Sequence, residues 1–166
     1  MGEVEVEDRR AGVTLVELMA VLALIGILAG LASASLRRVL ARAQTTAALH
    51  QLAADISYTR MLAVRGGSRV ELRFTNEGSC GGPHSGRFSA DGYRITVRDP
   101  APRVVRVARL RSSASGVCLE SNNDTNIVFG SRGLLLPFEN RTVWSRRHDV
   151  VDSLTVSVLG RVRRRF

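Results

Sequence analysis

A glycine followed five residues later by a glutamate marks the start of this chain as a place where chemistry could occur. Gly12 ends a polar stretch, and residues 13–34 are apolar apart from Glu17. Glycine suits a cleaved peptide bond, because a backbone without Cβ enters a protease site with least obstruction. A carboxylate in an apolar segment of this length costs about 2.5–3.5 kcal/mol on membrane-insertion scales, so it needs a partner or a function. The alternative is that Glu17 only snorkels to water.

A second group of candidate residues lies at the other end, close to the C-terminus: Gly160, Arg161, Arg163, Arg164 and Arg165. If residues 154–163 form one β-strand, alternation places Arg161 and Arg163 on one outward face, roughly 6.6–6.8 Å apart along the strand. Gly160 at their base would let another backbone approach. Guanidinium groups fork onto phosphate, and such contacts ignore base sequence. We therefore predict duplex DNA binding without sequence preference.

The two last arginines of this group are expected to contribute less to DNA binding. Arg164 and Arg165 lie next to the chain end, where strands fray. The alternative for the whole group is a solvated basic tail, or a tail that docks on an acidic neighbour.

The charge of the chain favours a polyanionic partner. All 24 basic residues are arginine, and the net charge is +9. A cut after Gly12 would remove two arginines and four acids and leave +11. Such an excess is typical of proteins that bind nucleic acid, acidic lipid or an acidic protein face. Aromatic residues make up only 5% of the chain, so it is poorly supplied with base-stacking side chains.

The two cysteines lack the spacing of a metal site. Cys80 and Cys118 stand far apart in sequence, without a CxxC pair. In an oxidising compartment we expect a disulfide between them, which in the chain-entropy model adds about 4 kcal/mol of stability. Two unpaired thiols are the alternative.

Catalytic and metal-binding arrangements are absent from the sequence pattern. The histidines are scattered at His50, His84 and His148. No GxSxG nucleophile motif occurs, and the oxygen-rich residues 121–126 lack the ligand order of an EF-hand. We therefore predict no enzyme activity, no metal and no cofactor.

The elements that position these residues follow from hydrophobic periodicity. Residues 13–34 predict a transmembrane helix, since 22 residues at about 1.5 Å per residue span roughly a bilayer core. Apolar residues at helical spacing predict that residues 35–65 continue it as an amphipathic helix. Gly66, Gly67 and Ser68 are expected to end the helix.

The rest of the chain, residues 66–166, alternates like antiparallel strands. Strands are expected at residues 69–74, 93–98, 103–110, 117–120, 127–129, 134–136, 142–144 and 154–163. Residues 99–102 are predicted to be a turn and residues 146–152 a polar linker. The predicted fold class is α+β, with a long N-terminal helix packed on a small antiparallel β-domain.

The N-terminal residues resemble the prepilin motif of type IV pilins and type II secretion pseudopilins. The resemblance rests on the run from Gly12 to Leu18, GVTLVEL, ahead of the apolar segment. It implies that residues 1–12 are a leader, that a prepilin peptidase cuts between Gly12 and Val13, and that the new amine is methylated. It also implies that Glu17 pairs with the Val13 amine during filament assembly. The family usually has Phe after the cut, where this chain has Val13.

The C-terminal residues resemble a second motif of the same family. Gly160-Arg161-Val162-Arg163 is similar to the GRxR motif of FimT-like minor pilins of the FimT/GspH branch, which take part in DNA uptake. The two resemblances together imply a minor pilin held in the inner membrane by one helix, with a periplasmic domain, which joins other pilins in a pilus and binds DNA for natural transformation. The alternative is a GspH-like minor pseudopilin with a structural role in type II secretion.

Overall fold

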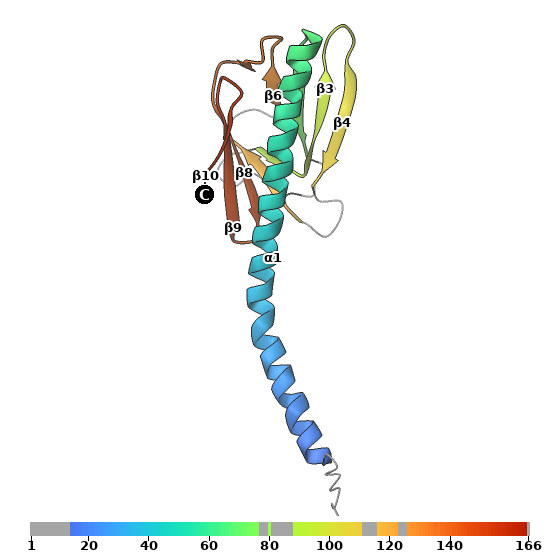
Figure 1. Cartoon of the computed structure of the whole chain (residues 1–166), viewed down its shortest axis with the longest axis vertical. Coiled ribbons are helices and arrows are strands. Elements are labelled where there is room, and N and C mark those ends of the chain that lie inside the picture. The colour runs from blue at the N-terminus through green and yellow to red at the C-terminus, as the bar shows by residue number, and fades with distance from the viewer. Residues whose placement is uncertain (1–13, 77–79, 81–87, 111–115, 123–125, 166) are drawn as a thin grey trace, which may run out of the picture. The chain divides into compact units, whose positions relative to one another are not determined.

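The computed structural model describes residues 14–76, 80, 88–110, 116–122 and 126–165. By its contacts the chain divides into two compact units, residues 1–37 and residues 38–166. One long helix, α1 (Leu15–Gly66), contributes to both units. The strands all lie in the second unit (Figure 1).

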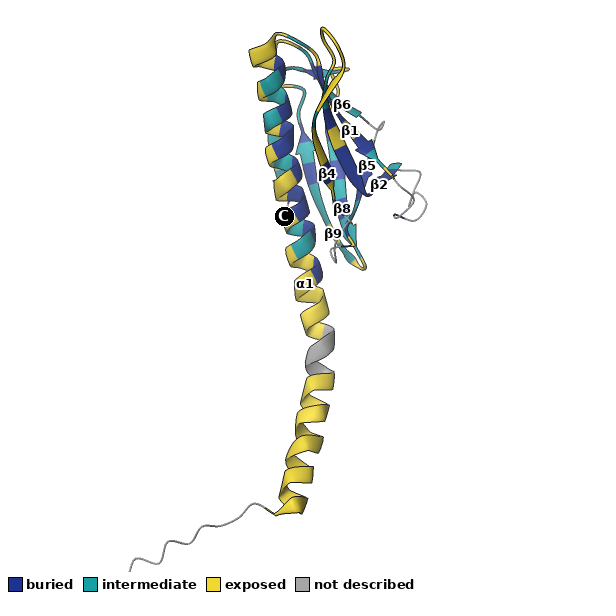
Figure 2. Cartoon of the chain, turned by 90° about the vertical axis from the view of Figure 1, so that its right-hand side faces the viewer, coloured by how far each residue is buried: buried dark blue, intermediate teal, exposed yellow. Residues whose placement is uncertain are grey.

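In the first unit, every residue of α1 up to Gly30 is exposed (Figure 2), and most of these residues are apolar. Leu15, Leu18, Leu22, Ile25 and Leu28 are each more than half exposed. In the part of the chain that the structure describes, α1 is the one helix long and apolar enough to cross a membrane. A helix with an apolar surface on every side needs an apolar environment around it.

In the second unit, α1 changes character and becomes part of a hydrophobic core. Leu49, Leu52 and Ile56 are fully buried at helical spacing, while the opposite side of the helix stays exposed. The helix ends in a Schellman arrangement: Gly67 takes a left-handed φ of 57°, and the Ser68 amide donates to the Ala63 carbonyl.

Two antiparallel five-stranded sheets complete the second unit. The first sheet has the order β4-β3-β1-β6-β7, and the second has the order β10-β9-β8-β5-β2. The strands of the first sheet are β1 (Val70–Thr75), β3 (Gly92–Val97), β4 (Arg103–Arg109), β6 (Asn126–Phe129) and β7 (Leu135–Leu136). Those of the second sheet are β2 (Phe88–Ala90), β5 (Cys118–Ser121), β8 (Arg141–Arg147), β9 (Val150–Val156) and β10 (Val162–Arg165).

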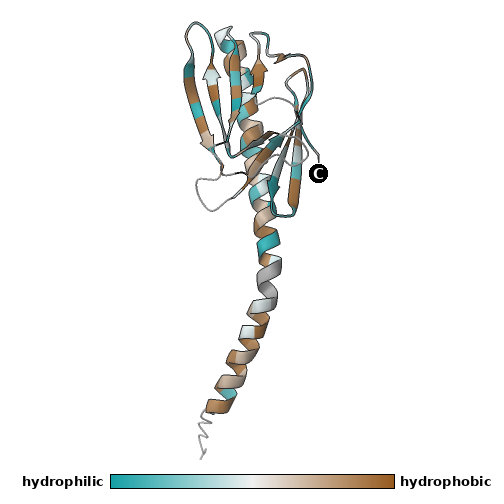
Figure 3. Cartoon of the chain, turned by 180° about the vertical axis from the view of Figure 1, so that it is seen from behind, coloured by the Kyte–Doolittle hydropathy of each residue, from teal (hydrophilic) through white to brown (hydrophobic). Residues whose placement is uncertain are grey.

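Both sheets pack on the same helix, with β3 and β4 on one side of α1 and β8 to β10 on the other (Figure 1). The core combines Leu49, Leu52 and Ile56 of α1 with alternate residues of the strands, such as Tyr93 and Leu154. This alternation of apolar and polar positions is visible along the strands from behind (Figure 3). The predicted α+β fold, a long helix packed on antiparallel sheets, is confirmed.

Two of the predicted elements are wrong. Residues 146–152 are not a linker, because β8 continues to Arg147, His148 takes a left-handed φ of 52°, and β9 begins at Val150. Residues 154–163 are not one strand, because the chain reverses between β9 and β10. In addition, the short strand β2 was not predicted.

Candidate nucleic-acid interface

The C-terminal arginines follow a tight hairpin rather than extending a single strand. The Gly160 amide donates to the Ser157 carbonyl at 2.7 Å, and the Ser157 amide donates to the Arg161 carbonyl at 2.9 Å. Gly160 takes a left-handed φ of 72°. A turn followed by a left-handed glycine in this bonding pattern is a G1-type bulge, which closes a hairpin with a three-residue loop. The left-handed conformation that the turn requires at position 160 therefore explains why a glycine precedes Arg161.

Gly160 also permits a close approach, although not by another backbone as predicted. A Cβ at this position would lie 2.7 Å from Cδ of Arg60 and 3.1 Å from Cε1 of Phe129. The Arg60 Nε donates to the Gly133 carbonyl at 3.1 Å, so the guanidinium stem of a helix residue lies under the hairpin turn. The expected backbone approach is corrected to a side-chain approach, in which Arg60 of α1 and Phe129 pack closely against Gly160.

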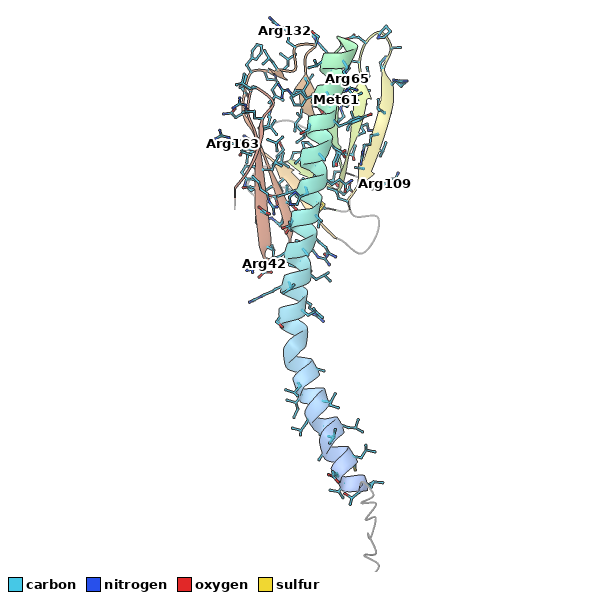
Figure 4. All side chains as sticks on the ribbon, viewed as in Figure 1. Arg42, Met61, Arg65, Arg109, Arg132 and Arg163 are labelled. Carbon is cyan, nitrogen blue, oxygen red and sulfur yellow. A yellow bond between two sulfur atoms is a disulfide. The ribbon has the colours of Figure 1, made fainter. Side chains whose placement is uncertain are left out.

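Arg161 and Arg163 are exposed, as expected for residues that bind a ligand. Arg161 belongs to the turn, and Arg163 lies on β10 opposite Thr155. The prediction of a single strand that carries both arginines is corrected, since the chain reverses at residues 157–161 and β10 begins only at Val162. Neither guanidinium forms a hydrogen bond or an ion pair with any residue that the structure describes. Arg163 projects away from the domain (Figure 4).

Arg164 has a different environment from the one predicted for a frayed terminus. It points to the opposite side of β10 and forms an ion pair with Asp152. Its Nη2 donates to Thr46 Oγ1 at 2.9 Å, and its Nη1 lies 2.9 Å from Nε2 of His50. Its side chain is only 16% exposed. Arg164 therefore docks the last strand on α1 and has little guanidinium surface left for phosphate.

Arg165 is described only by its backbone. It pairs with Ser153 at the end of β10, so the strand extends to the residue before the last. Its side chain lies outside the described residues.

At the other candidate site, the structure begins just after the expected cleavage point. Gly12 and Val13 lie outside the described residues. Thr14 caps the helix, since its Oγ1 accepts the Glu17 amide at 3.2 Å. Glu17 thus occupies the first turn of α1, where a carboxylate is favoured by the helix dipole. The sequence pattern T-x-x-E would have indicated this cap.

Cys80 and Cys118 form a disulfide. Cys118 begins β5, while Cys80 lies in the connection between β1 and β2, with its Sγ 3.4 Å from the Ala90 carbonyl oxygen. The bond closes a segment of 38 residues. It ties this connection to β5, the strand next to the edge of the second sheet.

Sequence reasoning missed the polar contact that fixes α1 to the first sheet. Asp55 is 2% exposed, accepts a hydrogen bond from the Tyr93 hydroxyl at 2.7 Å, and lies 3.2 Å from Nε of Arg106. Burial first, and then the hydrogen bond to Asp55, raise the pKa of Tyr93 above its ordinary value. The only signal in the sequence was an acid on the apolar side of the helix pattern.

Metal binding finds no support among the described residues. No group of three or more His, Cys, Asp or Glu side chains in this part of the chain lies close enough to hold an ion. His50 instead contacts Arg164, and His148 occupies the β8–β9 turn. Asn122 of the predicted oxygen-rich segment accepts the Thr142 amide, and residues 123–125 lie outside the described residues.

Two protein families match different parts of this chain. Residues 8–33 match the family described as Prokaryotic N-terminal methylation motif, and residues 48–160 match the family described as Type II transport protein GspH. No curated protein sequence matches this chain.

Two crystal structures of the type IV minor pilin FimU from Pseudomonas aeruginosa (strain PAO1) have a similar fold. In one crystal form the identity is 18%, the match covers 75% of this chain and 90% of FimU, and the TM-score is 0.57. In the other form the identity is 17%, the coverage is 72% and 91%, and the TM-score is 0.54. At this low sequence identity, the similarity to FimU shows a shared fold only.

Proposed function

This chain belongs to the GspH family of type IV minor pilins and pseudopilins, and from that premise we propose that it is a FimT-like minor pilin that binds duplex DNA for uptake. The observation that carries the proposal is the state of Arg161 and Arg163. Both are exposed, and neither forms an ion pair within the described part of the chain. A cation that no internal carboxylate neutralises is available to phosphate.

We further propose that the chain is made as a precursor. A prepilin peptidase removes residues 1–12 and methylates the amine of Val13. The methylation-motif match over residues 8–33 supports this step. One helix then holds the protein in the inner membrane, with the β-domain in the periplasm, where the Cys80–Cys118 disulfide is stable.

Assembly follows from Glu17. In the membrane this carboxylate is in the first turn of α1, and the Val13 amine carries the opposite charge. Pairing the two ions removes the unfavourable burial of each in a low-dielectric medium. The protein thereby joins other pilins in a filament, and the β-domain with its arginines faces outward.

DNA binding by this surface is expected to ignore sequence. Arginines that contact phosphates position a protein on DNA without reading the bases. No aromatic side chain lies on β10 or in its turn among the described residues, so base stacking has no platform there.

A binding titration tests this function. Labelled duplex DNA is titrated with the full-length chain in a neutral detergent, and fluorescence anisotropy reports the affinity. Arg161→Ala/Arg163→Ala should bind more weakly than wild type. Arg42→Ala/Arg65→Ala, which removes the same charge from exposed positions on α1, is the matched control and should bind almost as wild type does.

The second candidate function is that of a GspH-like minor pseudopilin, favoured by the family match over residues 48–160. In that case the protein is a structural part of a secretion apparatus and needs no nucleic acid. Wild-type protein that fails to bind DNA in the titration would support this function instead.

A further inference from the structure

A cluster of arginines occupies the outer face of the first sheet, away from α1. On β1 and β3, Val70, Leu72, Tyr93 and Ile95 point into the core. The residues between them therefore point to the other side of the sheet. They are Arg69, Glu71, Arg73, Arg94, Thr96 and Arg98, which we call the outer arginine face. Figure 3 shows this sheet from behind.

The strand register places like charges directly opposite each other on this face. Arg73 pairs with Arg94 across the two strands, and Glu71 pairs with Thr96. The Arg98 amide donates to the Arg69 carbonyl, so these two arginines are also neighbours. Opposed like charges destabilise a sheet. The pairs Arg73–Arg94 and Arg69–Arg98 therefore each carry an electrostatic cost. An external anion bound between the arginines would remove this cost.

The single acid of the face is already engaged. Glu71 is 3% exposed, and its carboxylate pairs with Arg98 and with Arg73, whose Nε lies 3.2 Å from Oε1. The side chains of Arg73 and Arg98 remain 50% and 48% exposed. Glu71 thus holds the stems of both arginines in place, and the face keeps an excess of positive charge.

Two further arginines of the face are exposed and have no side-chain partner among the described residues. Neither Arg69 nor Arg94 has a side-chain hydrogen bond or an ion pair with the residues that the structure describes. A groove of about 370 Å³ is lined by Arg73, Arg94 and Arg98 together with Glu71, and a second hollow of about 730 Å³ is lined by Arg69 and Arg98 together with Asp99. Arginines therefore outnumber acids around both depressions, which can admit a ligand.

We propose that the outer arginine face is a second DNA-binding surface, which holds a phosphate backbone along strands β1 and β3. The proposal rests on the proposed DNA-binding function and adds a surface separate from the C-terminal hairpin. From Arg69 to Arg73 the charge extends roughly 13 Å along the strand. This length suits a linear polyanion better than a single carboxylate, and guanidinium forks suit phosphate oxygens.

The proposal is tested by removing Arg69 and Arg94, the two arginines of the face without a side-chain partner in the described part of the chain. Full-length wild type, Arg69→Ala/Arg94→Ala, Arg161→Ala/Arg163→Ala and the combination of all four changes are titrated with duplex DNA in neutral detergent at several salt concentrations. Arg42→Ala/Arg65→Ala is the charge-matched control. The Arg69→Ala/Arg94→Ala variant should bind more weakly than this control, and its slope of log affinity against log salt should fall by roughly 0.9 for each phosphate that the variant no longer neutralises.

The outcomes separate this inference from the function on which it rests. If wild type binds DNA and the hairpin variant is weakened, but Arg69→Ala/Arg94→Ala matches the control in affinity and slope, the second surface is refuted while the proposed function stands. A control variant weakened as much as the face variant would also refute it, because net charge alone would then explain the weaker binding. The second surface would also be refuted if Arg69→Ala/Arg94→Ala bound DNA normally but assembled poorly into filaments. In that case the face would bind an acidic protein instead of DNA. Wild type that does not bind DNA refutes both.

Glu71→Gln tests the same face in the opposite direction, because it should strengthen DNA binding where the arginine variants weaken it. It removes the one negative charge of the face and releases Arg73 and Arg98 from their carboxylate. DNA should therefore raise the melting temperature of this variant by more than it raises that of wild type. An equal or smaller rise would contradict the proposal.

Discussion

Arg164 forms an ion pair with Asp152 across the β9–β10 hairpin, and both side chains are only 16% exposed. The same guanidinium reaches Thr46 and His50 on α1. One arginine of the C-terminal cluster therefore holds the last strand against the helix, while Arg161 and Arg163 remain exposed. The cluster combines a structural residue with two residues available to a ligand.

Arg164→Ala is predicted to lower the free energy of unfolding by about 1.5–3 kcal/mol, the range for hydrogen bonds to charged groups. Asp152 would lose its partner in a place with little access to water. Chemical denaturation of the full-length chain in detergent measures the change. Arg163→Ala on the neighbouring, exposed position is the control and should change stability by less than about 0.5 kcal/mol. Equal effects of the two changes would refute the structural role of Arg164.

Gly160→Ala is predicted to destabilise the domain for two reasons. An L-residue with a φ of 72° is strained by about 1–2 kcal/mol, and the new Cβ would meet Arg60 at 2.7 Å. Gly67→Ala is the control for strain alone, because Gly67 has a φ of 57° and open space around it. The Gly160 variant should lose more stability than the Gly67 variant in the same denaturation experiment. The reverse order would show that Arg60 does not restrict the turn.

Tyr93 gives the domain a predicted sensitivity to alkaline pH. Its pKa is raised in the folded protein by burial and by Asp55, so the folded state holds this proton more tightly than the unfolded state does. The resulting stabilisation is fully present below about pH 10, the ordinary pKa of tyrosine, and is lost as the pH rises above it. Tyr93→Phe should therefore lose less stability than wild type between pH 9 and pH 11, by thermal denaturation. Parallel curves for the two proteins would contradict this.

Glu17→Ala is predicted to leave processing and membrane insertion intact and to reduce incorporation into filaments. The change removes a charge from an apolar helix, so insertion should become easier, while the partner of the Val13 amine disappears. Shearing of filaments from cells followed by immunoblotting measures incorporation, and mass spectrometry verifies the N-terminus. Gly12→Leu is the control for a block before assembly, because it should leave the precursor uncut. Normal incorporation of Glu17→Ala would show that the carboxylate only snorkels.

The fold could be predicted because its periodicities are strong. Apolar residues at helical spacing, such as Leu49, Leu52 and Ile56, predicted the packed half of α1, and alternation of apolar and polar residues predicted the strands β1 and β3. The chain reversals were missed where alternation continues through a turn. Val156, Val158 and Val162 keep the period of a strand on both sides of Gly160, although this glycine was itself a turn signal.

The candidate site could be predicted only in part, because the partners of a charged side chain come from distant segments. Nothing next to Arg164 in sequence indicates Thr46 or His50, which lie more than 110 residues away. In the same way, the opposition of Arg73 and Arg94 depends on the register of β1 and β3. Two pairs of arginines four residues apart, Arg69 with Arg73 and Arg94 with Arg98, were visible in the sequence, but their shared face was not.

The central claim is that exposed arginines of the C-terminal hairpin contact DNA phosphates, and the salt dependence of binding tests it most directly. The affinity of the full-length chain for a duplex is measured between about 50 and 200 mM salt for wild type and for Arg161→Ala/Arg163→Ala. If both arginines contact phosphates, the variant should bind more weakly, and its slope of log affinity against log salt should be smaller by roughly 1.8. Equal affinity and equal slope for the two proteins would contradict the claim.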